Sequence, residues 1–382
     1  MQPSNTNLAI KAVIYRIASM LITFLVTYIF TRSLPLTTMA TVIIEILKTL
    51  WYYSFDSIWE FRIRDFISST IEKVGGIKEN YPLIPLSEKV KGFIALTRPL
   101  TMCGALVAGF FLVSLASYYY GTPFSFALAL ATGICLGILH GASQALNQAV
   151  TEEIAIDIIN KPYRPVVRGL ITQREAIAFA IALYAFSAAI AFVIKPVFVI
   201  GITVIALFSV FYTIPPVRIK RIFVLNNVWQ GIARGMLPVL AVFGIFNDFH
   251  FDLFPLALAT VICLWITGAQ SSKDIDDIEG DTKFGIRNFF TVLGKPKALA
   301  VMAILMGSSF VVLNLFICYL HYLPASMLPL NLLVFPSFGI VRSLNRKATL
   351  AENNYGWVMF YGTMSLWFVL PAILSLIANF IT

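Results

Sequence analysis

Lys273-Asp-Ile-Asp-Asp-Ile-Glu-Gly-Asp281 is an acidic stretch that directly follows an apolar run, 253–272. A second acidic stretch, Glu153-Ile-Ala-Ile-Asp157, follows the apolar run 125–150 in the same way. Carboxylates beside hydrocarbon cost free energy, and they persist there only when they are paired, hydrated or bound to a cation. Both stretches therefore predict a charged site at the end of a membrane-embedded bundle.

Hydrophobic residues make up 59% of the 382-residue chain, whereas charged residues make up 12%. Repeated apolar runs of about 20 residues are typical of membrane-spanning helices, so the chain is predicted to be an all-α, polytopic membrane protein. The expected spans lie near 13–31, 36–56, 97–118, 125–150, 174–194, 197–214, 225–246, 253–272, 298–320, 325–342 and 357–380.

The net charge of +9 does not indicate a nucleic-acid partner, because the basic residues follow alternate loops instead of one soluble face. Lys and Arg collect in 57–98, 157–174, 216–221, 273–297 and 342–347. The turns 119–124, 247–252 and 321–326 contain none, and only Arg32 and Lys195 break the pattern. This positive-inside alternation predicts an integral membrane protein whose two acidic stretches face the cytoplasm.

Two modules are expected. Residues 1–62 are predicted to form a transmembrane helical hairpin, 63–88 a polar connector with Gly75-Gly76, and 89–382 the main domain. The hairpin resembles a small two-helix membrane domain family of unknown function. The matching positions are Tyr15-Arg16, Thr23-Phe24, Glu45-Ile-Leu-Lys48 and Trp59.

The spacing of the carboxylates suggests a metal site. On a helix, Asp274, Asp277 and Asp281 would share one stripe, with Asp276 and Glu279 pointing elsewhere. Mg²⁺ binds one or two protein carboxylates and keeps other positions for substrate phosphate and water, so carboxylates converging from two helices suit it. The predicted Mg²⁺ ligands are Glu153, Asp157, Asp274, Asp277 and Asp281.

Basic residues accompany these carboxylates. A bare cation site has no use for so many positive neighbours, whereas a diphosphate does. They are Lys161 and Arg164 after the first stretch, Lys273 before the second, and Arg218 and Lys220 after Tyr212-Thr-Ile-Pro-Pro216. Solvated loop charges that only set the topology are the alternative for a single stretch, but two stretches on the same side favour a site.

Three further residues have two interpretations each. Tyr163 and Tyr212 are either aromatic residues of the membrane interface or substrate contacts. Arg234, in Trp229-Gln-Gly-Ile-Ala-Arg-Gly-Met236, lies inside a predicted span and is a candidate functional residue. It is expected to face the phosphates, although a salt bridge to a carboxylate would look the same in the sequence.

At these residues, 89–382 resembles the UbiA family of intramembrane prenyltransferases. The family signature is N-D-x-x-D-x-x-x-D running into N-K-P-x-R-P, a Y-S-x-P-P-x-R-x-K loop, and a second D-x-x-D-x-x-G-D. Asn160 to Pro165 and Tyr212 to Lys220 match it. The second acidic stretch, with Phe284-Gly-Ile-Arg287 and Val292-Leu-Gly294 after it, is most similar to the homogentisate and chlorophyll branch.

The first motif departs from the family pattern. Counted back from Asn160, Asp157 and Glu153 take the acidic positions, but Ala149 stands where the family has Asn. Asn147 resembles that Asn displaced by two residues. Either a helical bulge brings Asn147 into register, or the first half of the metal site is altered.

The resemblance implies a nine-helix bundle and Mg²⁺-dependent transfer of an isoprenoid from a prenyl diphosphate to an aromatic, quinone-precursor-like or other lipophilic acceptor in the bilayer. The expected catalytic residues are Asp157, Asp277, Asp281, Lys161 and Arg164. The expected substrate contacts are Asn147, Asn160, Tyr163, Tyr212, Arg218, Lys220, Arg234 and Lys273.

Other functions remain open at this point. A terpene cyclase on the same scaffold would ionise the same diphosphate, and an ether-lipid geranylgeranyl transferase would use a lipid hydroxyl as acceptor. A transporter is disfavoured because its site would lie near the bilayer midplane within paired repeats, whereas these acidic stretches lie at span ends. A purely structural membrane protein has no use for two carboxylate clusters.

Overall fold

The computed structural model describes residues 86–345, 349–350 and 353–381. The predicted hairpin 1–62 and most of the connector 63–88 lie outside the described residues. Within the described part, the chain is all-α apart from β1 (Thr349–Leu350) and β2 (Asn353–Asn354), which form one short antiparallel pair. The all-α prediction is confirmed.

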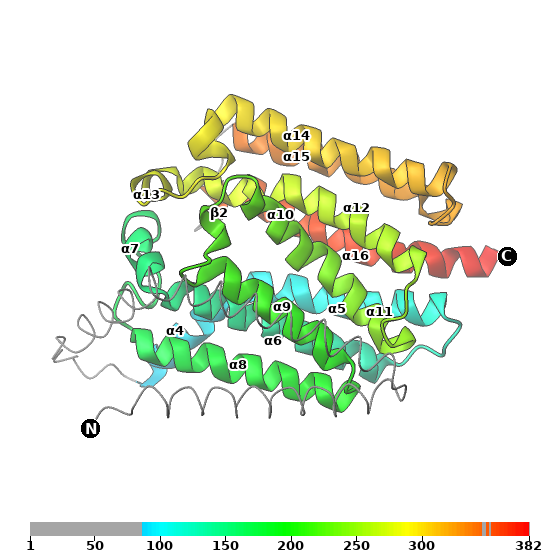
Figure 1. Ribbon diagram of the computed structural model, residues 1–382, viewed down its shortest axis with the longest axis horizontal. Coiled ribbons are helices and arrows are strands. Elements are labelled where there is room, and N and C mark those ends of the chain that lie inside the picture. The colour runs from blue at the N-terminus through cyan, green and yellow to red at the C-terminus, as the bar shows by residue number, and fades with distance from the viewer. Residues whose placement is uncertain (1–85, 346–348, 351–352, 382) are drawn as a thin grey trace, which may run out of the picture. The chain divides into compact units, whose positions relative to one another are not determined.

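Nine helical runs correspond to the nine spans predicted after residue 97 (Figure 1). Eight are long and apolar enough to cross a membrane, and the ninth, α9, is a shorter apolar helix. The runs are α5 (Pro99–Tyr119), α6 (Phe126–Ala149), α8 (Gln173–Ile194), α9 (Phe198–Thr213), α10 (Leu225–Gly231) with η3 (Ile232–Met236) and α11 (Leu237–Asn247), α12 (Leu253–Ala269) with η4 (Gln270–Asp276), α14 (Phe289–Cys318), η5 (Ala325–Leu333) with α15 (Val334–Asn345), and α16 (Tyr355–Ile381).

Shorter helices connect these runs. They are α4 (Leu86–Thr97), α7 (Thr151–Asn160), η2 (Ile219–Arg221) and α13 (Ile278–Lys283). Figure 1 shows α7 and α13 side by side at one end of the bundle, and the two helices are in contact. The two acidic stretches therefore meet in space, although their first carboxylates, Glu153 and Asp274, are 121 residues apart in the sequence.

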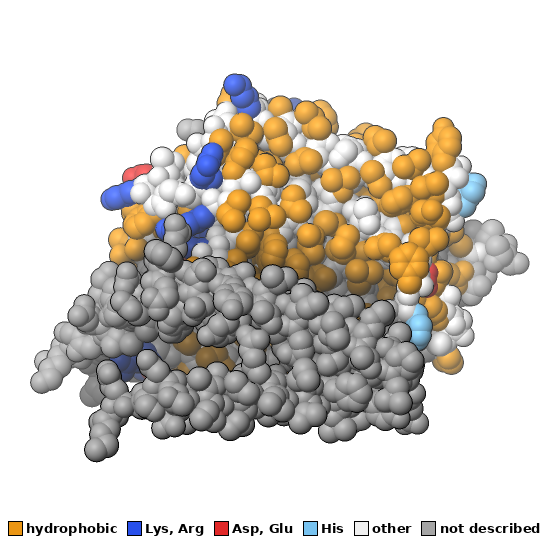
Figure 2. All heavy atoms as spheres, viewed as in Figure 1, with side chains coloured by type: hydrophobic (Ala, Val, Ile, Leu, Met, Phe, Trp, Pro, Cys, Tyr) orange, Lys and Arg blue, Asp and Glu red, His pale blue; other side chains and the backbone are white. Residues whose placement is uncertain are grey.

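Apolar side chains cover the flank of the bundle (Figure 2). Large hydrophobic residues on α8, α14 and α15 are exposed, among them Val193 at 85%, Val311 at 71% and Phe338 at 71%. Exposure of so many large apolar side chains would be unfavourable in water but suits helices that face lipid. Inside, Trp265 on α12 stacks on Phe360 of α16 with ring centroids 5.8 Å apart. The chain is therefore an integral membrane protein.

One span contains a π-helical segment, η3, between α10 and α11. A wider turn of this kind adds one residue to the helix and is frequent at functional sites. Gly235 in η3 lies against α12, where a Cβ would meet the Cα of Cys263 at 2.9 Å. The missing side chain lets the segment approach α12, and the neighbouring Arg234 is directed into a cavity described below.

The helices α5 and α6 pack through glycines. A Cβ on Gly133 of α6 would lie 2.6 Å from the backbone oxygen of Leu106, and a Cβ on Gly109 of α5 would lie 2.8 Å from the Cα of Gly133. Small residues at such crossings let membrane helices approach closely, and packing then stabilises their association. This contact fixes α6, which carries several residues of the cavity.

Gly133→Ala is expected to destabilise the protein by about 1–3 kcal/mol, because the added methyl must push against backbone and not against a flexible side chain. The matched control is Gly307→Ala on α14, where an added Cβ has no atom within 4 Å among the described residues. Thermal unfolding of both variants in detergent measures the difference. Equal melting temperatures would contradict the close α5–α6 contact.

Candidate functional site

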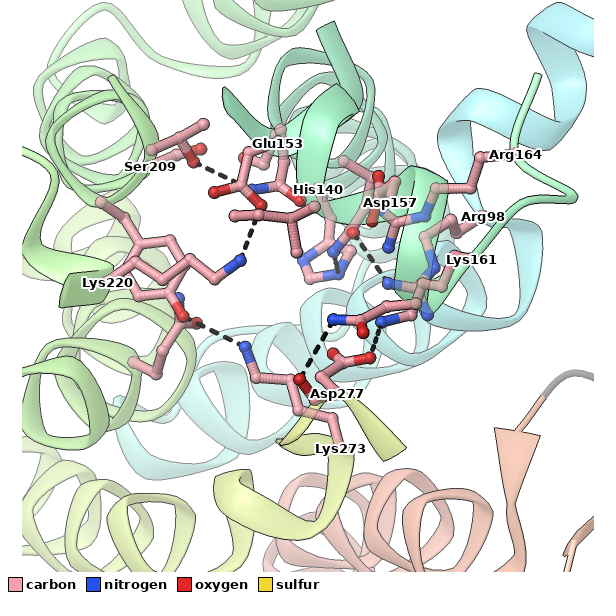
Figure 3. Close-up of a pocket in the computed structure, with 18 of the residues that line it drawn as sticks. Arg98, His140, Glu153, Asp157, Lys161, Arg164, Ser209, Lys220, Lys273 and Asp277 are labelled. Carbon is pink, nitrogen blue, oxygen red and sulfur yellow. Dashed lines mark hydrogen bonds and ion pairs between the residues drawn. The ribbon is translucent and has the colours of Figure 1, made fainter. Parts of the chain in front are cut away.

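A cavity of about 230 Å³ lies at the end of the bundle that carries α7 and α13. Figure 3 shows charged side chains converging on it from several helices. Every predicted site residue lines it except Arg218 and Asp274. Those that do are Asn147, Glu153, Asp157, Asn160, Lys161, Tyr163, Arg164, Tyr212, Lys220, Arg234, Lys273, Asp277 and Asp281.

Glu153 is held by two cations. Its Oε1 accepts a hydrogen bond from Arg218 Nη2 and its Oε2 accepts one from Lys220 Nζ, both at 2.6 Å. Burial by itself would raise the pKa of Glu153, but the charges of Lys220 and Arg218 outweigh it and lower the pKa to about 2. Arg218 is only 2% exposed and lies behind Glu153, which explains why it does not line the cavity.

Asp157 forms an ion pair with Arg164. Both side chains are buried, and burial raises the pKa of Asp157 although the charges of Arg164 and Lys161 oppose the change. A buried pair of this kind gains little net stability from its attraction, because both groups have lost water. Its arrangement instead keeps a carboxylate and a guanidinium together at the cavity wall.

The two acidic stretches are joined directly. Lys161, just after α7, forms an ion pair with Asp277, which precedes α13. Beside it, Asn160 Nδ2 donates to the backbone oxygen of Asp277 at 3.1 Å, and the Gly280 N–H donates to Asn160 Oδ1 at 2.9 Å. A Cβ at Gly280 would meet Asn160 Oδ1 at 2.5 Å, so glycine permits this contact.

The single stripe predicted for Asp274, Asp277 and Asp281 is wrong. The segment η4 is a 3₁₀-helix and α13 begins only at Ile278, so no continuous α-helix contains the three residues. Lys273, Asp276 and Asp277 line the cavity, whereas Asp274 does not. Asp276, predicted to point elsewhere, is a residue that the sequence analysis missed.

Asp281 and Asp274 differ in their surroundings. Asp281 Oδ2 accepts a hydrogen bond from Asn288 Nδ2 at 2.8 Å, and burial raises the pKa of Asp281 to about 7. Asp274 is 4% exposed, with Lys273 Nζ 3.7 Å from its Oδ1. Its Oδ2 is buried without a hydrogen-bond partner within the described part of the chain. A carboxylate oxygen left in this state is a candidate for an additional ligand.

Tyr212 lies inside the protein and not at a lipid interface. It is 7% exposed, its hydroxyl donates to Asn226 Oδ1 at 3.0 Å, and it accepts a hydrogen bond from Lys273 Nζ at 3.1 Å. Tyr212 therefore positions the Lys273 ammonium in the cavity. Tyr163 is 38% exposed and also lines the cavity.

The helical bulge considered for Asn147 is not present. Val150 has an extended backbone (φ −76°, ψ 133°) that ends α6 at Ala149 and separates it from α7. Asn147 nevertheless lines the same cavity as Glu153 and Asp157, and its Nδ2 lies 3.4 Å from Thr213 Oγ1. A break between two helices, and not a change of helical pitch, brings these residues together.

Several lining residues were not identified from the sequence. They are Arg98 before α5, His140 and Gln144 on α6, and Trp357 and Tyr361 on α16. Of these five residues, only Arg98 and His140 could have been singled out in the sequence. Arg98 is a cation at the edge of a predicted span, and His140 is an imidazole inside one. Gln144, Trp357 and Tyr361 are ordinary residues of membrane helices until the fold places them.

A second, apolar cavity of about 60 Å³ adjoins the first. The two share His140, Ser143, Ile205, Ala233 and Arg234 in their linings. Further along, the apolar cavity is bounded by Ala108 on α5, Leu136 and Leu139 on α6, and Met364 and Phe368 on α16. A polar chamber that leads into an apolar one between helices suits an amphiphile with a charged head.

The carboxylates do not form a ready metal cluster: in the described ranges, no three His, Cys, Asp or Glu side chains are arranged to hold an ion. Glu153, Asp157 and Asp277 instead form ion pairs with cations. This donor set fits a Mg²⁺ ion that takes one or two carboxylates and completes its shell with phosphate and water. It does not fit a cage built from protein ligands alone.

Comparisons with known proteins agree with the fold. Residues 105–369 match the model of the UbiA prenyltransferase family, and residues 9–60 match a family described as a predicted membrane protein (DUF2061). The main domain also resembles a solved UbiA homolog from Archaeoglobus fulgidus bound to DMAPP and Mg²⁺, with a TM-score of 0.57 and 18% identity over 74% of this chain and 98% of that one.

Two curated relatives are digeranylgeranylglyceryl phosphate synthases. The one from Pyrococcus furiosus is 27% identical over 56% of this chain and 74% of its own length. The one from Methanoculleus marisnigri is 30% identical over 54% of this chain and 70% of its own length. The resemblance to the homogentisate and chlorophyll branch stays a prediction. The family match covers more than half of the chain, and the chain is therefore a prenyltransferase that belongs to the UbiA family.

Proposed function

We propose that this protein transfers an isoprenoid from a prenyl diphosphate to a lipophilic acceptor, with Mg²⁺ as cofactor. The observation that carries this proposal is the polar cavity, in which carboxylates and cations from α7, η4 and α13 face one another beside an apolar cavity. A prenyl diphosphate has the matching shape, with a polyanionic head and a hydrocarbon tail. The positive-inside pattern of the loops supports a site that faces the cytoplasm.

The cations of the cavity would bind the leaving diphosphate. Lys161, Arg164, Lys220 and Lys273 line the wall and can donate charge-assisted hydrogen bonds to phosphate oxygens. Mg²⁺, held by one or two of the carboxylates of Glu153, Asp157, Asp276, Asp277 and Asp281, would supply further charge neutralisation at the diphosphate. Negative charge grows on this group as the bond to carbon breaks, so the cations stabilise the transition state more than the ground state.

The reaction breaks the C–O bond between the isoprenoid C1 and the diphosphate, and it forms a bond from C1 to a nucleophilic atom of the acceptor. That atom loses a proton, and inorganic diphosphate leaves. The allylic cation that develops at C1 would react with bulk water, and the helices that enclose the apolar cavity exclude that water.

For the acceptor, we favour a lipid hydroxyl over an aromatic ring. Both curated relatives described above are digeranylgeranylglyceryl phosphate synthases by name, and their matches span 56% and 54% of this chain. An aromatic acceptor is the interpretation that the second acidic motif suggested. Mass spectrometry of the products formed from geranylgeranyl diphosphate with each class of acceptor, and with none, distinguishes a lipid ether, a prenylated aromatic and a cyclised terpene.

Asp277→Asn is expected to reduce prenyl transfer at least about 100-fold, because it removes a carboxylate that faces the diphosphate and releases Lys161. The matched control is Glu279→Gln, which makes the same chemical change two residues away on an exposed side chain outside the cavity. Turnover is followed by mass spectrometry with purified protein in detergent. Near-normal turnover by a folded Asp277→Asn variant would refute the proposed site.

Mg²⁺ and diphosphate are expected to bind together and not separately. Asp157 and Asp277 form ion pairs with Arg164 and Lys161. Mg²⁺ alone must therefore displace these side-chain cations without gaining phosphate ligands. Inorganic pyrophosphate with Mg²⁺ should therefore raise the melting temperature clearly more than the sum of the two separate effects. A full shift with Mg²⁺ alone, or with pyrophosphate in excess chelator, would argue against a shared site.

A further inference from the structure

We propose that His140 is the proton acceptor of the transfer: its Nε2 takes the proton that the acceptor atom loses as its bond to the isoprenoid C1 forms. The inference rests on the proposed function and deepens it, because transfer alone does not specify which group removes this proton. It makes His140, on α6, a catalytic residue with a role distinct from binding the diphosphate.

The first observation is the place of the reacting carbon. C1 joins the diphosphate to the hydrocarbon tail, so it lies where the polar cavity meets the apolar one when the head occupies the first and the tail the second. The carboxylates of the site line only the polar cavity. Five residues line both cavities and are therefore nearest to this boundary: His140, Ser143, Ile205, Ala233 and Arg234.

Only one of these five side chains is suited to take a proton. Ile205 and Ala233 are hydrocarbon, and an arginine has donors but no acceptor. The hydroxyl of Ser143 is a very weak base, and it already donates to the backbone oxygen of Leu139 at 3.1 Å. The imidazole of His140 remains, and histidine is the side chain that most often acts as a general base.

The hydrogen bonds around His140 keep its ring in the neutral, basic form. Gln144 Oε1 accepts from Arg98 Nη1 at 3.3 Å, which directs the amide nitrogen of Gln144 to His140 Nε2 at 3.1 Å. An amide nitrogen only donates, so Nε2 carries no proton and the neutral ring has its proton on Nδ1. The lone pair that can accept a proton therefore belongs to a residue of the cavity wall (Figure 3).

The chemical step balances with this base. The C1–O bond breaks and its electron pair leaves with the diphosphate. An electron pair of the acceptor atom forms the new bond to C1, the bond from that atom to hydrogen breaks, and the proton passes to Nε2, where the acceptor has replaced the Gln144 amide. Attack on a carbocation makes this proton strongly acidic, so a base as weak as imidazole suffices. The imidazolium then gives the proton to the inorganic diphosphate.

The leaving diphosphate is the competing base in the cavity. Its oxygens face Mg²⁺ and the cations of the polar cavity, and each of these contacts lowers the basicity of the oxygen that makes it. His140 Nε2 instead faces the neutral amide of Gln144. The negative charge of the diphosphate also stabilises an imidazolium that shares the cavity with Arg98 and Arg234. The two groups thus act together, His140 as the base and the diphosphate as its counter-ion.

The test uses the full chain in detergent with Mg²⁺, geranylgeranyl diphosphate and geranylgeranylglyceryl phosphate, or homogentisate if the wild type prenylates that acceptor instead. His140→Gln keeps an oxygen that can accept from Gln144 but loses the basic nitrogen, and His140→Ala leaves space for added imidazole. The matched control is His321→Gln, the same change in the loop after α14 and outside both cavities. Prenyl transfer, geranylgeraniol and released diphosphate are measured separately.

We expect His140→Gln to lower the kcat for transfer by about 100-fold, within the usual contribution of a general base, and to change the KM of each substrate by less than about 3-fold. Diphosphate release should fall less than transfer, because C1 still ionises and water captures the cation, so geranylgeraniol should accumulate. Added imidazole should restore part of the transfer by His140→Ala. His321→Gln should match the wild type in every measurement.

An unchanged kcat in a folded His140→Gln protein would overturn the assignment and identify the diphosphate as the base. A loss confined to KM, or a His140→Ala protein that imidazole does not restore, would overturn it as well, because each result leaves His140 a binding or structural residue. Absence of transfer by the wild type to every acceptor would refute the proposed function, which is a different outcome.

If neither variant folds, the wild-type protein decides the question. Its three histidines are His140, His250 and His321, and diethyl pyrocarbonate modifies neutral imidazoles. Loss of transfer is expected to follow the modification of His140, measured by mass spectrometry of peptides, and not that of the other two. Transfer that persists after His140 is modified, or a His140 that does not react, would overturn the proposal.

Discussion

The ion pair between Lys161 and Asp277, with the Asn160 amide beside it, joins two segments that are 116 residues apart in the chain. Each segment alone is an acidic stretch at the end of a membrane helix. Together they enclose one cavity, because the amide of Asn160 fixes the backbone of the turn before α13 while the ammonium of Lys161 fixes its carboxylate. The geometry of the whole site depends on this junction.

Charge is distributed unevenly over the cavity. At the α7 and α13 end, carboxylates and cations neutralise each other, and a bound Mg²⁺ and diphosphate could exchange partners with them without a large change in net charge. Arg98, in the polar cavity, and Arg234, at its boundary with the apolar cavity, instead donate hydrogen bonds to the neutral side chains of Gln144, Gln270 and Tyr361.

The sequence predicted the parts of this structure that follow from hydropathy and charge. Nine spans were placed from apolar runs, and Glu153, Asp157 and Asp277 were grouped because loops on one side of a membrane meet. The local backbone geometry could not be predicted from the sequence. The segment 270–276 is a 3₁₀-helix and not a continuation of α12, and Asp276, not Asp274, lines the cavity.

The position of Arg234 shows that the packing between helices determines the final geometry of such a site. An arginine within a membrane span is tolerated only where it faces the protein interior or a hydrated cavity. Gly235 allows η3 to lie against α12, and the wider π turn then directs Arg234 to the boundary between the polar and apolar cavities. The glycines and the arginine are visible in the sequence. Their joint effect also depends on Gln270 of η4 and Tyr361 of α16, which accept hydrogen bonds from the guanidinium, and no spacing rule connects residues so far apart.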